Sequence, residues 1–367
     1  MYGVAVSGES MQSGDEGRSP LTGISVIIPV KNEEASIRRL LQALGAQTHR
    51  PAEIVITDGG SADRTKQVVR AFQAECPVPI VLIESEPPLP GRGRNLAIAR
   101  AANEWLACID GGIVPAPDWL AELVAVARRE PEAQVVYGRC VPVTDSYFTS
   151  CAAVAYVPVG RRARFLPSCL LRRAAWAAAG GFREDLRSGE DLLFFRALER
   201  AGVREAYSDR AVVAWELQPD TGRTFRRFAT YSRSSMQAGL GRDWQWKVVR
   251  LYVVLAALLL TGLWVWPLML LPPLLLLLRA EKHVWLWHRA KAPRRVWRGL
   301  LNPRRVLTVA WITVIIDLAT FYGMWRWAAY DHPTGGERRG SINRTTLSAG
   351  RVDLEGGDDR RSFRISK

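Results

Sequence analysis

The sequence is poor in the side chains that hold zinc and similar metals. Of 367 residues only five are cysteine and four are histidine, and His49 is the one histidine in the N-terminal two thirds of the chain. The cysteines are odd in number and show no Cys-x-x-Cys spacing; they are Cys76, Cys108, Cys140, Cys151 and Cys169. This pattern argues against a zinc site, a histidine-ligated catalytic metal and a disulfide framework, and it suits a reducing compartment.

The two ends of the chain lack apolar patterning. Residues 1–20 are polar and rich in Gly and Ser, without the apolar core of a secretory signal, and residues 331–367 are polar and Gly-rich. We expect a disordered leader over 1–20 and a disordered tail over 331–367, because neither segment has enough apolar surface to fold.

The chain has fewer acidic than basic residues, with a formal net charge of +14 and a pI near 10.0. A net positive charge of this size favours an anionic partner: a nucleic acid, a phosphate-bearing substrate or an anionic membrane surface. The basic residues cluster beside apolar segments, and no helix-turn-helix or base-stacking pattern is present. We therefore expect membrane binding and no nucleic acid.

Two C-terminal stretches lack charge almost entirely. Residues 251–278 contain no charged side chain and residues 306–325 contain only Asp317. Each is long enough to cross a hydrocarbon core of about 30 Å. Basic residues flank 251–278 on both sides, however, and a single crossing cannot leave both flanks in the cytoplasm. Pro267 and the pair Pro272-Pro273 would break the segment into a re-entrant hairpin that enters and leaves on one face.

These features divide the chain at about residue 245. Residues 21–245 form the expected globular domain and residues 246–330 a membrane-associated region. Within that region we expect the hairpin at 251–278, a basic interfacial loop at 279–305 and a transmembrane helix at 306–327. Asp317 inside the last segment is either functional or paired with an arginine of the loop.

The globular part alternates between strand and helix patterns. Apolar, β-rich runs at 24–29, 53–57, 80–83 and 105–109 are separated by segments with helical spacing. A more mixed region follows, with short strands at 135–137 and 211–214 and helices at 173–179 and 190–201. The alternation predicts an α/β fold with a doubly wound, mostly parallel sheet.

Polar groups stand at the ends of these strands and the starts of helices. Asp110 follows a buried run and precedes two glycines, and ligands bind at the carboxyl ends of strands in an open parallel sheet. Asn32-Glu33, Asp58 and Glu190-Asp191 occupy comparable places. Asp110 is therefore the first site candidate, although an Asp-Gly turn without chemistry accounts for it equally well when it is taken alone.

Together these groups resemble the family 2 glycosyltransferases of the Rossmann-like GT-A fold. The resemblance covers about residues 22–240 and rests on residues 26–33, 58–65, 94–95, 110, 180–182 and 189–191. It implies a nucleotide-sugar donor site made of Pro29, Val30, Asn32, Glu33, Asp58, Arg92, Arg94, Asp110 and Gly111. A carboxylate at position 58 suits a uracil or ribose donor group, and Arg92 and Arg94, ahead of a helix, suit a diphosphate.

The metal site departs from the family pattern. The family has aspartate, any residue, aspartate after the fourth strand, whereas the third position here is Gly112. Either Asp110 holds a divalent cation (Mg²⁺ or Mn²⁺) together with substrate phosphates, or Arg92 or Arg94 meets the leaving diphosphate without a metal.

Asp191 is the expected general base. An inverting transfer needs a carboxylate on the face of the sugar opposite to the leaving nucleotide, and a helix start keeps such a group ionised. Glu190 would then position the acceptor or brace the loop. The alternative is that both acids only complement the helix N-terminus.

The resulting prediction is a membrane-attached inverting enzyme that moves one sugar from a nucleotide-sugar, expected to be a UDP-sugar, to a hydroxyl of a lipid or lipid-linked glycan. It would act in cell-envelope glycan biosynthesis at the cytoplasmic face of the plasma or inner membrane. A processive polysaccharide synthase is the nearest alternative, but residues 223–228 lack the tryptophan of its Gln-x-x-Arg-Trp element. A catalytically inactive nucleotide-sugar-binding membrane protein is a third reading, which the retained Glu190 and Asp191 argue against.

Overall fold

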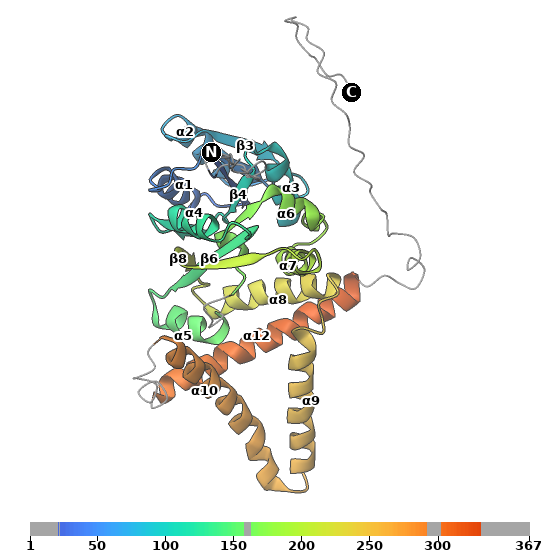
Figure 1. The fold of residues 1–367 in the computed structure, drawn as a ribbon. Helices are drawn as coiled ribbons and strands as arrows, with labels where there is room; N and C mark the ends of the chain where they lie inside the picture. The colour runs from blue at the N-terminus through green and yellow to red at the C-terminus, as the bar shows by residue number, and fades with distance from the viewer. Residues whose placement is uncertain (1–20, 22, 158–162, 292–301, 332–367) are drawn as a thin grey trace, which may run out of the picture.

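The computed structural model describes residues 21, 23–157, 163–291 and 302–331 (Figure 1). The leader expected at 1–20, nearly all of the tail expected at 331–367 and part of the basic loop expected at 279–305 lie outside these residues.

The N-terminal half of the sheet is parallel. Strands β1 (Ile24–Val30), β2 (Glu53–Asp58), β3 (Ile80–Glu84) and β4 (Trp105–Cys108) lie in the order β3-β2-β1-β4. They alternate with helices α1 (Ile37–Gly45), α2 (Thr65–Gln73) and α3 (Pro90–Arg100). Continuous apolar runs form these strands because both faces of a parallel sheet are covered by helices. Their carboxyl ends therefore meet at one edge.

Beyond β4 the sheet is mixed. Strand β7 (Cys169–Arg172) pairs with β4, and β6 (Val135–Val143), β8 (Glu205–Glu216) and β5 (Ile113–Pro115) complete an eight-stranded sheet. Strands β7 and β5 run antiparallel to their neighbours, while β6 and β8 pair parallel. The associated helices are α4 (Trp119–Arg129), α5 (Tyr147–Tyr156), α6 (Arg173–Ala178) and α7 (Glu190–Arg200). The predicted α/β fold with a mostly parallel sheet is confirmed.

The core lies on both faces of the sheet. One apolar cluster joins the sheet to α1, α2 and α4 through Leu40, Val69 and Leu123. A second cluster joins the opposite face to α3 and α7 through Ile98 and Phe194. These layers hold the strand ends rigidly, so polar groups placed there are preorganised.

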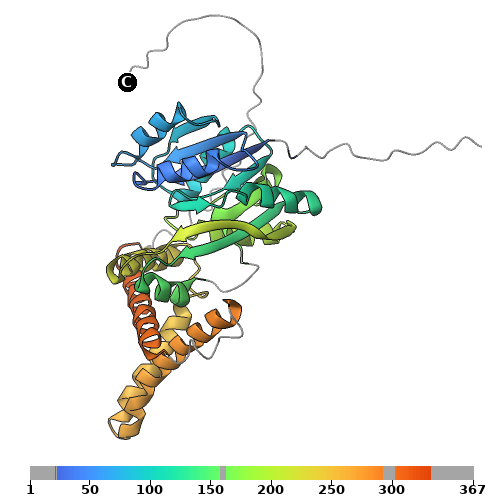
Figure 2. The ribbon, with the colours of Figure 1, turned by 90° about the vertical axis from the view of Figure 1, so that its left-hand side faces the viewer.

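Four longer helices form the C-terminal part: α8 (Thr221–Gln237), α9 (Gln245–Gly262), α10 (Leu271–Lys291) and α12 (Pro303–Tyr330). Figure 1 shows α9 and α10 as the arms of a V that meets at a short 3₁₀ helix, η2 (Trp266–Leu270). In Figure 2, as in Figure 1, the V projects away from the sheet.

The break between these arms covers residues 263–270 and includes Pro267 but not Pro272 and Pro273. Pro272 and Pro273 occupy the first turn of α10, where the missing N–H groups have no helical partner to lose. The prediction of a loop from residue 279 is wrong for 279–291, because these residues continue α10. A helix does not end where its sequence turns basic, provided that the residues remain good helix formers, as Arg, Ala, Glu and Lys are here. The placement of the V in a membrane stays a prediction.

Helix α12 lies along α8. The Ser232 hydroxyl donates to the Thr320 carbonyl at 2.8 Å, and Arg233 binds Asp331 through two contacts of 2.5 and 2.7 Å. Among the described residues, α9 and α12 are the two helices long and apolar enough to cross a membrane. In the most apolar 18 residues of each helix, 22% of α9 and 56% of α12 is buried inside the protein. The transmembrane helix expected at 306–327 also stays a prediction.

Asp317 is fully buried and pairs with an arginine. The guanidinium of Arg279 contacts both carboxylate oxygens, at 2.5 and 3.1 Å. Arg279 lies in α10 rather than in a loop. The pair fixes α10 against α12, which is the second of the two roles considered for Asp317.

Candidate active site

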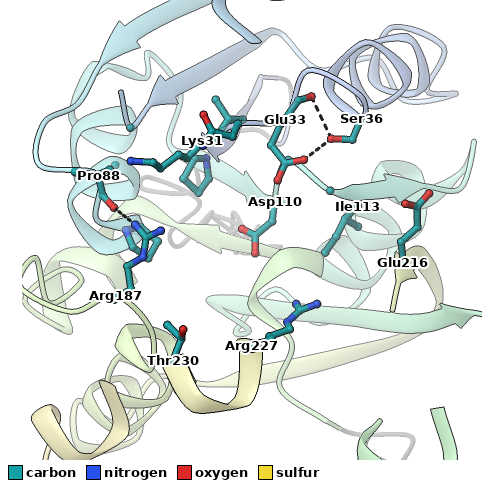
Figure 3. A pocket seen from close by; sticks show the side chains of 18 of the residues that line it. Lys31, Glu33, Ser36, Pro88, Asp110, Ile113, Arg187, Glu216, Arg227 and Thr230 are labelled. Atoms are coloured by element: carbon teal, nitrogen blue, oxygen red, sulfur yellow. Dashed lines mark hydrogen bonds between the residues drawn. The ribbon is translucent and has the colours of Figure 1, made fainter. Parts of the chain in front are cut away.

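A cleft of about 750 Å³ lies at the carboxyl ends of β1, β2 and β4 and is closed on its other side by the start of α8. Figure 3 shows Asp110 at its centre, with Glu33 above it and Arg227 across from it. Seven of the predicted donor-site residues line this cleft: Pro29 and Val30 at the end of β1, Asn32 and Glu33 in the loop that follows, and Arg94, Asp110 and Gly111. The site therefore lies where an open parallel sheet places its ligands.

The first two loops of the domain are joined through Asn32. This residue has a left-handed backbone, with φ of 55°, which asparagine tolerates better than most residues. Its backbone N–H donates to the Ser61 hydroxyl at 2.9 Å, and its Oδ1 accepts from the Ala62 N–H at 2.9 Å. Asn32 thus holds the β1–α1 loop against the β2–α2 loop at the rim of the cleft.

Three buried side chains at the ends of β2 and β3 have oxygens without a partner among the described residues. These atoms are Thr57 Oγ1, Asp58 Oδ2 and Ser85 Oγ, whereas Asp58 Oδ1 accepts from the Ser61 N–H at 2.8 Å. Thr57 and Ser85 line the cleft, and Asp58 directly precedes Gly59, which also lines it. Because an unpaired buried polar atom costs free energy, such a group at a cleft marks a place for a polar ligand.

Arg94 connects two of the candidate carboxylates. Its Nη2 donates to Asp110 Oδ1 at 2.7 Å and its Nη1 to Glu190 Oε1 at 2.6 Å, while the guanidinium is almost fully buried. Burial opposes the charge of Arg94, but the two carboxylates outweigh this and raise its pKa. Arg94 therefore stays charged and joins the end of β4 to α7. It also lines the cleft, and its contact with a diphosphate stays a prediction.

Arg92 is also placed differently from the prediction. Both arginines lie inside α3, because the helix begins at Pro90 instead of after the Gly-Arg-Gly-Arg run. Arg92 pairs with Glu184 at 3.2 Å and is not among the residues that line the cleft.

Four cations that the sequence does not predict line the cleft together with Arg94. They are Lys31, Arg187, Arg223 and Arg227. Arg223 and Arg227 are four residues apart on α8 and so share one helix face. Arg227 donates to the Tyr231 hydroxyl at 2.7 Å and lies over the Trp215 ring at 5.0 Å. A search for polar residues at the ends of strands misses these four cations, because they come from α8 and from loops. The four-residue spacing of Arg223 and Arg227, which places them on one helix face, is the feature of the sequence that could have identified them.

Glu190 and Asp191 begin α7 beside Arg94. Gly189 precedes them with φ of 86°, a turn that favours glycine. Glu190 is buried against Arg94, and burial raises its pKa. Burial also raises the pKa of Asp191, with a contribution from the negative charge of Asp110. Neither residue lines the cleft itself. Arg94 joins Glu190 to Asp110 of the cleft, and Asp191 directly follows Glu190 in the first turn of α7.

The carboxylates at the cleft fit a divalent cation. A Cβ atom at Gly112 would lie 3.7 and 3.8 Å from the two carboxylate oxygens of Glu33. Glu33 thus fills the space into which a side chain at position 112 would extend. Burial and the nearby Asp110 raise the pKa of Glu33, while its bond from the Ser36 hydroxyl lowers it.

Two carboxylates are the ligands that a protein typically contributes to a divalent cation when substrate phosphates supply the others. Mg²⁺ is usually held by one or two carboxylates together with phosphates and water. In the part of the chain that the structure describes, no group of three or more His, Cys, Asp or Glu side chains is arranged for a metal. Glu33 and Asp110 supply oxygen ligands only, which suits a hard cation and not zinc.

Comparisons with known proteins agree with this architecture. Residues 25–174 match the model of glycosyl transferase family 2. Glycosyltransferase AglE of Haloferax volcanii is 36% identical over 104 residues, which are 28% of this chain and 34% of that protein. The pre-mycofactocin glycosyltransferase of Mycobacterium tuberculosis is 26% identical over 226 residues, which are 58% of this chain and 46% of that protein. The chain thus spans about a third to a half of the length of these relatives.

A solved structure extends the comparison to the fold. The mannosyltransferase PcManGT of Pyrobaculum calidifontis, in complex with GDP-Man and Mn²⁺, aligns with a TM-score of 0.52 at 18% identity, over 82% of this chain and 87% of that one. At this identity the likeness concerns the fold alone. The family match and the eight-stranded sheet with its site at the carboxyl ends of β1, β2 and β4 show that the chain carries a family 2 glycosyltransferase domain with the GT-A fold.

Proposed function

We propose that the protein is an inverting glycosyltransferase that moves a single sugar from a nucleotide-sugar to a hydroxyl of a lipid or lipid-linked glycan. The observation that carries the proposal is the Arg94 bridge, which joins the donor-side carboxylate Asp110 to the start of α7, where Asp191 lies. A donor cleft and a carboxylate suited to proton transfer thereby belong to one site.

The donor is proposed to be a UDP-sugar. The unpartnered oxygens of Thr57, Asp58 and Ser85 combine two hydroxyls with one carboxylate. Uracil presents one N–H donor between two carbonyl acceptors, so a carboxylate flanked by hydroxyls matches its edge. A base bound there leaves its diphosphate beside Asp110 and Glu33, since all of these residues belong to the same cleft or its rim.

The diphosphate is proposed to meet both a divalent cation and basic side chains. Glu33 and Asp110 would hold Mg²⁺ or Mn²⁺, which supplies positive charge to the departing nucleotide. Lys31, Arg187 and Arg227 line the same cleft and add further positive charge. Preorganised cations of this kind stabilise the negative charge that develops on the leaving group.

Asp191 is the proposed general base. It takes the proton of the acceptor hydroxyl while the acceptor oxygen forms a bond to the anomeric carbon and the bond from that carbon to the diphosphate oxygen breaks. A single displacement of this kind inverts the anomeric centre. Glu190 does not touch the reactants in this proposal; it holds Arg94, which in turn orients Asp110.

The acceptor side is proposed to lie at the cytoplasmic face of the plasma or inner membrane. The exposed apolar V of α9 and α10 supports this placement, with large exposed fractions at Leu263, Trp264 and Trp266. Exposed apolar surfaces of this size usually mark sites that bind a membrane or another protein. We place the V in one leaflet and α12 along the surface beside α8. An enzyme held in this way adds one sugar to a lipid without a secretion channel.

The proposed activity is tested with purified full-length protein and labelled UDP- and GDP-sugars, with and without Mg²⁺ or Mn²⁺. We expect turnover of a UDP-sugar that falls about 10²- to 10⁴-fold in Asp191→Asn, because a general base contributes about that much. Nucleotide binding should be retained. The matched control is Asp209→Asn, an exposed aspartate outside the cleft.

Two outcomes would overturn the proposal. Nucleotide binding without any turnover would make the chain a binding protein. Full activity in Asp191→Asn would remove Asp191 from the reaction.

A further inference from the structure

A second cavity adjoins the donor cleft. It has a volume of about 660 Å³ and lies between α8, α12 and the loop that precedes α7. The two cavities share three lining residues, Leu89, Arg187 and Thr230. A molecule bound in the second cavity can therefore reach into the donor cleft at this point.

The second cavity has a surplus of positive charge. Its arginines are Arg187, Arg226, Arg233 and Arg326, against a single acidic residue, Asp185. Asp185 is already paired with Arg183 at 2.5 Å.

Two of the four arginines, Arg187 and Arg226, have no acid beside them among the described residues, and the other two, Arg233 and Arg326, share Asp331. Arg233 binds Asp331 directly, and the charge of Arg326 also lowers the pKa of Asp331. Arg187 donates to the Pro88 carbonyl at 2.8 Å, and the guanidinium of Arg326 lies over the Tyr330 ring at 5.6 Å. Uncompensated guanidinium groups around one cavity favour an anion, and their planar, forked geometry suits phosphate.

An apolar surface continues from the basic one. Phe225 of α8 and Tyr322 of α12 line the cavity with ring centroids 5.6 Å apart. Trp325 lies next to Tyr322 at 5.7 Å and is exposed, as is Leu318 one turn before Tyr322. The cavity thus pairs a basic pocket with an exposed apolar strip, which matches a phosphate group that carries a hydrocarbon chain.

We propose that this cavity binds the phosphate of the acceptor, a phosphate-bearing lipid, and that the acceptor hydroxyl enters the donor cleft past Leu89, Arg187 and Thr230. The inference rests on the proposed transferase function and names the class of acceptor for it. Arg187 is followed closely by Gly189 and Asp191, so the segment that lines the cavity also carries the proposed base. Positioning of the phosphate and deprotonation of the hydroxyl would then depend on neighbouring parts of one chain segment.

The test measures phosphate binding apart from catalysis. Full-length protein in dodecyl maltoside is titrated with dodecyl phosphate and, separately, with inorganic phosphate. We expect dodecyl phosphate to bind more tightly, and Arg226→Gln and Arg326→Gln each to weaken it roughly tenfold or more, as for loss of a charged hydrogen bond. The matched control is Arg70→Gln, an exposed arginine on α2 far from both cavities along the chain. Neither cavity variant should change nucleotide affinity or the hydrolysis of donor alone, because neither residue lines the donor cleft.

Each other result counts against the inference. Unchanged dodecyl phosphate binding in both variants would overturn it, as would an equal loss in Arg70→Gln, which would indicate a general effect of charge. If inorganic phosphate binds as tightly as dodecyl phosphate, the cavity is a site for a free anion, and the proposal of a lipid acceptor is wrong. If the wild type turns over no nucleotide-sugar, the proposed function fails. If turnover persists while these binding results fail, the acceptor inference alone is wrong. Circular dichroism of each variant checks that it is folded.

Discussion

Arg94 determines the charge balance at the floor of the donor cleft. It is the shared partner of Asp110 and Glu190, and all three groups are partly or fully removed from water. A buried carboxylate that loses its cation is left with an uncompensated charge, which costs far more than the pair gains when intact. The side chain therefore serves both stability and the orientation of Asp110.

Replacement of Arg94 should be strongly destabilising. We expect Arg94→Met to lower the free energy of unfolding by about 3–5 kcal/mol, because Glu190 stays buried without its partner. Arg92→Met is the matched control two residues away; its pair with Glu184 is exposed, and its loss should cost less than about 1 kcal/mol. Urea unfolding followed by circular dichroism measures both. Equal stabilities for the two variants would show that the Arg94 bridge is unimportant. The double variant Arg94→Met/Glu190→Gln should recover part of the loss.

At the scale of elements, the sequence predicts best where local pattern and tertiary environment agree. The runs at 24–29 and 53–57 are buried on both faces, so their composition alone identifies β1 and β2. The position of Asp110 at a strand end follows from the same pattern. The pairing of Arg94 with Glu190 cannot be predicted in this way. Glu190 is 96 residues away along the chain, and only the packing of α7 on α3 brings the two side chains together. Likewise, the local sequence does not reveal that α10 packs against α12 through the Arg279–Asp317 pair, because the two residues are 38 positions apart.

The contact between α8 and α12 offers a second prediction. A Cβ at Gly323 would lie 2.5 Å from the Ala229 carbonyl oxygen, 2.7 Å from Ser232 Cβ and 2.9 Å from the Arg233 nitrogen. Helix propensity alone favours alanine over glycine by about 1 kcal/mol, but the overpacking against backbone costs about 1–3 kcal/mol. We therefore expect Gly323→Ala to destabilise the protein and to lower donor turnover, since α8 carries Arg223 and Arg227 into the cleft.

The control for this prediction is Ala328→Val, an added side chain at an exposed position of the same helix. Thermal unfolding and donor hydrolysis are measured for both variants. A Gly323→Ala protein that is more stable than the wild type would mean that propensity prevails and that the two helices are not in the close contact described.

At the scale of the whole molecule, the dimensions of the V limit how it meets a membrane. The uncharged part of α9, residues 251–262, is about 18 Å long and that of α10, residues 271–278, about 12 Å, at 1.5 Å per residue. A hydrocarbon core is about 30 Å thick. We therefore expect each arm to reach through about one leaflet, with the charges that end the two arms, Arg250 and Arg279, on the same side. Because α12 lies along α8, whose four arginines would otherwise enter hydrocarbon, we expect α12 to lie at the surface and not to cross the membrane as its sequence predicts.

The tip of the V should then control membrane binding. Trp264 and Trp266 are 82% and 72% exposed, and each should contribute about 2 kcal/mol on burial, or about thirtyfold in partitioning. We expect Trp264→Ser and Trp266→Ser each to weaken flotation with vesicles of phosphatidylcholine and phosphatidylglycerol by about that factor. Leu192→Ser, an exposed apolar residue on α7, is the control and should have no effect.

Proteolysis of the vesicle-bound protein separates insertion into one leaflet from a complete crossing. In the arrangement proposed here, trypsin added outside the vesicles has access to Arg250 and Arg279 from the same side, so both flanks of the V are cleaved while the uncharged tip is protected. A segment that crosses the bilayer would keep one flank inside the vesicle, and that flank would be cut only after detergent is added. Protection of a single flank would therefore refute the one-leaflet arrangement even if the tryptophan variants behave as expected.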